Sequence, residues 1–245
     1  NPMKNALVLI ASCAGFTAAL AGNVQIQVLD KDGQPVADAV VVLYPAASTA
    51  AAPTLLAPNP VVEQEKMRFV PAVSVVATGT TVRFVNRDTW DHHVRGTAAG
   101  AASFQAAADG AGFELRLAGK VDGKPASNAE VRMDKPGPVL LGCHLHGSMR
   151  GHVFVTDSAW TLKTEADGTA RFSGVPDGAT RVRVWHADQL IDLPQRTLQV
   201  LPAPVQDTAL NGAQVTSLVD LVSQARAGTI PVDTAEAIAA ASFPL

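Results

Sequence analysis

The most constraining feature of the sequence is a group of three potential metal ligands within seven residues. Cys143, His146 and Met149 follow one another at intervals of three along the chain. A histidine pair, His92-His93, lies about fifty residues upstream. Donors this close in sequence converge only from a tight turn between two strands, and a further donor then comes from a neighbouring strand. The pattern therefore favours a β-sandwich that carries a ligand-bearing turn.

The donor types favour copper over other metals. A thiolate, two imidazoles and a weak thioether suit an ion that cycles between Cu(I) and Cu(II). Zinc also takes cysteine and histidine, but a thioether is a poor zinc ligand. A nucleophilic cysteine–histidine pair would need an orienting Asn or Asp, for which the sequence has no recognisable signature. The remaining alternative is a buried cysteine with surface histidines.

The N-terminal segment is typical of an exported protein. An apolar run from Ala6 to Leu20 follows a lysine and ends in a small-x-small pattern, which predicts a signal peptide over residues 1–21. The run is short for the roughly 20 residues that a bilayer span needs. Cleavage removes Cys13 and leaves Cys143 as the one cysteine. A lone thiol in an oxidising compartment is a liability unless something occupies it. The sequence predicts a periplasmic or secreted protein with no stable membrane span in its mature form.

Residues 60–156 resemble the cupredoxins, most closely the amicyanin and plastocyanin branch, and also exported proteins described as methylamine-utilization-like. The matching stretches are Phe69-Val70-Pro71, Gly79 to Asp88, His92-His93-Val94, Pro136-Gly137 and Cys143-x-x-His146-x-x-Met149 with the strand to Val155. In amicyanin-like proteins an Asn lies six residues before the first ligand His, as Asn86 does before His92. The resemblance implies a Greek-key sandwich with one type 1 copper ion held by His92, Cys143, His146 and Met149. It also implies that Asn86 steadies the ligand loop through hydrogen bonds.

The sequence departs from the family pattern close to the expected ligands. Asp91 stands where Pro commonly precedes the His, and His144-Leu145 replaces the Thr-Pro usual in amicyanin. His93 is therefore an alternative to His92 as the ligand. The extra imidazoles of His93, His144 and His152 are candidates for binding a second metal ion, with solvent-facing histidines as the alternative.

The segments on either side of residues 60–156 together resemble a carboxypeptidase regulatory-like, or transthyretin-like, β-sandwich. Its opening motif matches residues 30–42, and its closing motif matches 164–184. We expect a first part at 22–47, a linker at 48–59 and a second part at 157–203, so that the cupredoxin is inserted into the sandwich. A tandem arrangement is the alternative. Helical spacing predicts short helices in the C-terminal tail, residues 204–245.

The fold class expected overall is mainly β, with two sandwiches. The function expected is one-electron transfer in the periplasm, to a redox partner protein that the sequence does not identify. Copper storage or delivery without redox cycling, and a structural binding module, are alternatives. A copper oxidase is disfavoured because the additional His-x-His clusters of an oxygen-reducing centre are missing. A formal net charge of −3 argues against nucleic-acid binding.

Overall fold

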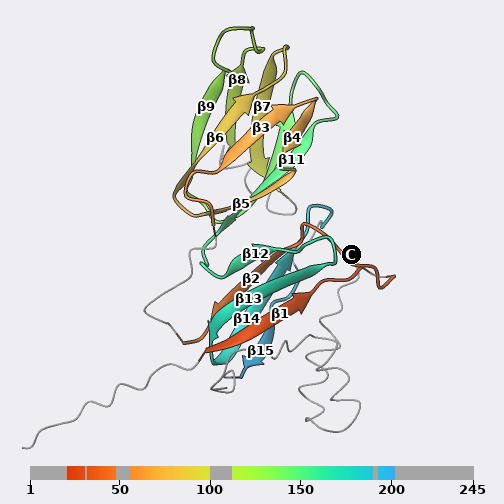
Figure 1. Ribbon diagram of the computed structural model, residues 1–245, viewed down its shortest axis with the longest axis vertical. Helices are drawn as coiled ribbons and strands as arrows, with labels where there is room; N and C mark the ends of the chain where they lie inside the picture. Colours follow the sequence, from red (N-terminus) through yellow and green to blue (C-terminus); the bar gives the residue numbers. More distant parts are fainter. Residues whose placement is uncertain (1–20, 31, 48–55, 100–111, 190–192, 202–245) are drawn as a thin grey trace, which may run out of the picture.

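The computed structural model describes residues 21–30, 32–47, 56–99, 112–189 and 193–201. These residues form two β-sandwiches, one above the other in Figure 1, and contain no α-helix. The predicted mainly-β class is therefore confirmed. The predicted signal peptide, most of the predicted linker and the predicted C-terminal helices lie outside the described residues. Within the described ranges, no helix has the length and apolar character needed to cross a membrane.

The central sandwich is built from residues 61–156 and contains two sheets. The five-stranded sheet has the order β5-β11-β10-β7-β8, which are Val73–Ala77, Arg150–Thr156, Gly137–Cys143, His92–Ala98 and Gly112–Leu117. The four-stranded sheet has the order β4-β3-β6-β9, which are Arg68–Val70, Val61–Glu65, Thr80–Asn86 and Asn128–Met133. Neighbouring strands are often distant in sequence, because the chain crosses between the sheets as in a Greek key. Cys143 and Met149 belong to the hydrophobic core between the two sheets.

The flanking sandwich contains strands from both ends of the described chain. β1 (Ala21–Gln27) pairs with β13 (Thr169–Pro176), and a second sheet has the order β12-β2-β14-β15. These four strands are Thr161–Lys163, Val40–Pro45, Gly178–Trp185 and Arg196–Val200. Alternate residues of β1 are buried in the core of this sandwich, as the period of two in the sequence predicts. Strands that precede residue 48 therefore pair with strands that follow residue 156.

β2 is buried on both faces and joins the two sandwiches. Val41 and Leu43 enter the flanking core. Val40 and Val42 instead pack in an interface cluster with Val73, Phe154 and Trp185. Lys163 strengthens this contact, since its Nζ donates to the backbone oxygen of Val73 at 2.9 Å. The two sandwiches thus meet through a packed apolar contact.

His152 lies at the edge of the interface cluster. It belongs to β11, three residues after Met149, and its ring meets the Trp185 ring edge-on with centroids 5.3 Å apart. Burial lowers the pKa of His152 below its ordinary value, Asp188 partly offsets this effect, and His186 adds to it. The neutral imidazole is therefore the form that suits this position.

Candidate metal centre

Three potential metal ligands converge at one end of the central sandwich. His92 is the first residue of β7, Cys143 is the last residue of β10, and His146 lies in the turn that leads to β11. β7 and β10 are adjacent antiparallel strands in which Val94 pairs with Cys143. This register brings the start of β7 next to the end of β10. His92 and Cys143 are 51 positions apart in sequence, and the pairing of β7 with β10 brings them together.

The donor atoms form a nearly equilateral triangle. His92 Nδ1 lies 3.2 Å from His146 Nδ1, and Cys143 Sγ lies 3.6 and 3.5 Å from these two nitrogens. A point equidistant from all three is about 2.0 Å from each, which is close to the roughly 2.0–2.3 Å of nitrogen–metal and sulfur–metal bonds. In the described part of the chain this is the one group of three such residues whose donor atoms lie within 4.8 Å of one another. The triangle fits a single metal ion.

The site is buried on one side and reaches the surface on the other. His92, Cys143 and Met149 are buried, whereas His146 is half-buried and Leu145 beside it is exposed. Met149 lies in the same core cluster as Cys143, and its backbone N donates to the His146 oxygen at 3.0 Å. This bond closes the turn. Met149, the fourth predicted ligand, is thus buried directly after the turn that carries His146.

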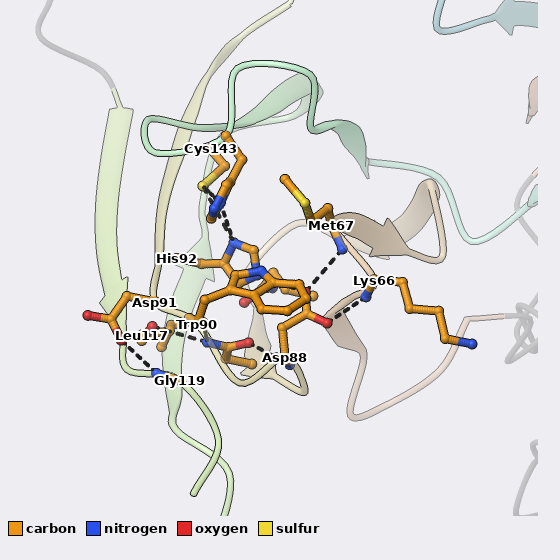
Figure 2. Close-up of polar contacts among 12 residues, drawn as sticks. Lys66, Met67, Asp88, Trp90, Asp91, His92, Leu117, Gly119 and Cys143 are labelled. Carbon is orange, nitrogen blue, oxygen red and sulfur yellow. Dashed lines mark hydrogen bonds and ion pairs between the residues drawn. The ribbon is translucent and has the colours of Figure 1, made fainter.

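Asp88 fixes the orientation of the His92 ring. Figure 2 shows the imidazole between Cys143 and Asp88, and its Nε2 lies 3.0 Å from Asp88 Oδ2. Because a carboxylate accepts hydrogen bonds, this contact holds the proton on Nε2 and leaves the lone pair of Nδ1 toward Cys143 and His146. The required tautomer is therefore set by a residue that does not itself join the triangle.

Asp88 is itself held by the turn between β3 and β4. Lys66 N and Met67 N donate to its two carboxylate oxygens at 2.6 and 3.1 Å, and both residues have positive φ. Burial alone would raise the pKa of Asp88. The hydrogen bonds from Met67, His92 and Lys66 outweigh burial and bring the pKa below its ordinary value. Asp88 is therefore ionised at neutral pH.

Asn86 joins three segments around the site. Its buried amide Nδ2 donates to the backbone oxygens of Trp90, Leu117 and Ala118, and its Oδ1 accepts from Asp88 N at 2.9 Å. These bonds hold the loop from β6 to β7, on which both Asp88 and the approach to His92 depend. The position is the one that the family resemblance implies for a residue that steadies the loop.

His93 and His144 lie outside the triangle. His93 Nε2 contacts Glu114 Oε2 at 3.1 Å, and the His93 and His144 rings stack with centroids 5.4 Å apart. Of the two adjacent histidines, His92 is the one whose ring reaches Cys143. Sequence reasoning did not single out Asp88, although its place four residues before His92 is the available signal.

A scan against protein-family models finds no match. A search of curated proteins likewise finds no match. Among solved structures, the chain is similar to a proline-to-alanine mutant of amicyanin in the oxidised state, with 22% identity and a TM-score of 0.31. That match covers 49% of this chain and 99% of the amicyanin chain.

Two further amicyanins give similar values. The amicyanin of Paracoccus versutus is 23% identical, with a TM-score of 0.29 over 46% of this chain and 97% of its own. A proline-to-glycine mutant in its reduced Cu(I) form at pH 4 is 24% identical, with a TM-score of 0.29 over 49% of this chain and 99% of its own. Each of these three amicyanin chains is covered over 97–99% of its length by 46–49% of this chain.

Proposed function

We propose that this protein is a type 1 copper protein that carries single electrons. The observation that carries the proposal is the triangle of His92 Nδ1, Cys143 Sγ and His146 Nδ1, with sides of 3.2 to 3.6 Å. Copper bound there would supply reversible one-electron redox chemistry. A thiolate and two neutral imidazoles are the donors that suit both of its oxidation states.

Each residue has a distinct role in this proposal. Cys143 would supply the strong thiolate bond to copper, and the thioether of the buried Met149 would be a weaker ligand that tunes the reduction potential. Asp88 keeps the His92 Nδ1 free of a proton, and Asn86 holds the loop. Because His92 and Cys143 lie on paired strands, their donor atoms would move little when the copper ion gains or loses an electron. His146 is the half-buried ligand and offers the route by which an electron leaves the site.

The cellular setting belongs to the same proposal. The N-terminal segment supports export to the periplasm, where a redox partner protein would dock near His146. We also propose that residues 60–156 are a cupredoxin inserted into a regulatory-like sandwich, which orients the copper domain toward that partner. The pairing of β1 with β13 and of β2 with β14 supports this arrangement, because both pairs join segments on opposite sides of the insert.

The visible spectrum of the protein loaded with Cu(II) tests the proposal. We expect an intense thiolate-to-copper charge-transfer band that is lost on reduction and returns on oxidation. Cys143→Ala should abolish the band and His92→Ala should disturb it strongly, whereas the adjacent control His93→Ala should retain it. Copper bound with only weak d–d absorption would mean that Cys143 is not a ligand. The proposed function would then be copper storage and not electron transfer.

A further inference from the structure

A second pair of imidazoles lies beside the first, where β7 adjoins the end of β10. Side chains alternate along a strand, so His93 on β7 faces away from His92. His144 is the first residue after β10. The two residues are neighbours, because His144 N donates to the His93 oxygen at 2.8 Å. Their rings stack at 25° with centroids 5.4 Å apart. The pairing of β7 with β10 that brings His92 near Cys143 thus also brings His93 next to His144.

His93 has the same kind of carboxylate partner as His92. Its Nε2 lies 3.1 Å from Glu114 Oε2 on β8, and the other oxygen of Glu114 accepts from Arg95 Nε at 2.9 Å. Because the carboxylate accepts, the proton lies on Nε2 and the lone pair on Nδ1. Histidines that bind metals commonly donate their second ring nitrogen to a carboxylate in this way. His93 is therefore oriented as a ligand would be.

We propose that His93 and His144 form a second, exchangeable site for Cu(II), with Glu114 as the residue that positions His93. Imidazole suits copper, and Cu(II) binds most tightly among the divalent first-row ions. Neither residue offers sulfur, so the pair favours Cu(II) over Cu(I). His144 is exposed, so rotation of its side chain would bring a ring nitrogen to the same ion as His93 Nδ1.

The geometry also limits the strength of this site. Among the described residues, only the inner triangle has three donor atoms within 4.8 Å of one another. The outer site therefore forms on rotation of His144, with water in the remaining coordination positions. The positive charge of Arg95, held on Glu114, lowers the affinity further. We expect the outer site to fill after the inner one and to exchange its ion more readily.

The test is a titration of the full chain with Cu(II), followed by electron paramagnetic resonance. The first equivalent is expected in the inner site and the second in a tetragonal environment with nitrogen ligands. His144→Asn should abolish the second signal and leave the first unchanged. Glu114→Gln should weaken the second binding step by roughly 10–100-fold, as loss of such a partner commonly does.

The controls separate this proposal from the proposed function. His186→Ala removes a histidine of the flanking sandwich and should leave both signals intact. The proposal is overturned if the wild-type chain binds a single equivalent, or if His144→Asn and Glu114→Gln both keep the second signal at unchanged affinity. A second signal that depends on His144 would support the outer site even if the inner site gave no charge-transfer band.

Discussion

The position of the His92 ring depends on Asp88, and the substitution Asp88→Asn tests that dependence. The carboxylate accepts from three donors: Lys66 N through Oδ1, and Met67 N and His92 Nε2 through Oδ2. Asparagine keeps one oxygen and replaces the other by an amide NH₂. It has nearly the same shape, so the substitution changes the hydrogen bonds without opening a cavity.

The magnitude follows from the donors that asparagine leaves unpaired. If the amide oxygen keeps the bond to Lys66 N, the NH₂ group faces both Met67 N and the His92 ring; in the flipped orientation it faces Lys66 N. In either orientation the His92 ring loses its ionised acceptor. A buried donor without a partner costs about 1–3 kcal/mol. The imidazole escapes this cost by moving its proton to Nδ1, where the proton opposes metal binding. We therefore expect the metal-free protein to lose about 1–3 kcal/mol of unfolding free energy, and copper affinity to fall roughly 10–100-fold.

Two measurements check this expectation. Urea denaturation of the metal-free protein gives the change in unfolding free energy, and competition with a chromophoric Cu(I) chelator gives the change in affinity. The matched control is Asp91→Asn, in the same loop. Asp91 is exposed and accepts one hydrogen bond, from Gly119 N at 2.8 Å, which asparagine can keep. Equal copper affinities for the two variants would refute the role assigned to Asp88.

Three further predictions concern packing and pH. Gly151→Ala places a methyl group 2.8 Å from Phe69 Cβ and should lower the unfolding free energy, measured by urea denaturation, by about 1–3 kcal/mol. The control Gly142→Ala, whose methyl group has an Arg150 nitrogen at 3.6 Å as its nearest contact, should lower it less. Equal losses in the two variants would contradict this prediction. Trp185→Ala should cost about 3–5 kcal/mol in the same assay, because it empties the interface cluster, and a near-neutral result would mean that the two sandwiches do not depend on this contact. The pKa of His152 is lowered in the folded state, so the unfolded chain binds more protons, and stability should fall as pH drops below the ordinary histidine value of about 6.5. In the His152→Asn variant, the midpoint temperature of thermal denaturation should change less between pH 5 and 7 than it does in the wild type. If the midpoint depends on pH equally in both proteins, His152 is not the source of that dependence.

The sequence predicted the mainly-β class because its signals are local. The alternation of Val24 and Ile26 with polar residues is a property of neighbouring residues, and it appears unchanged in the burial of β1. The spacing of three residues between Cys143 and His146 likewise predicted that their side chains converge. The local pattern could not show which of His92 and His93 is the ligand, because strand alternation predicts only that the two side chains lie on opposite faces. The decision rests on the pairing of β7 with β10, which is a long-range property.

Asp88 shows a different reason why sequence reasoning falls short. An aspartate four residues before a histidine is common, and its meaning here depends on where Lys66 and Met67 point their backbone N–H groups. Those groups converge because both residues adopt positive φ in the turn between β3 and β4. Neither residue type favours that conformation strongly. The carboxylate site is therefore created by tertiary structure rather than by a motif.

The pairing of β1 with β13 also bears on the order of folding. Gln27 pairs with Thr169, so the flanking sandwich closes only when segments from opposite sides of the central sandwich meet. The described strands of the central sandwich all come from residues 61–156, so it needs no strand from outside this range and can fold first. Its compact fold brings the ends of the intervening segment together and reduces the entropy that the later closure must overcome. The folded central sandwich thus holds the segments that carry β1 and β13 close enough to pair.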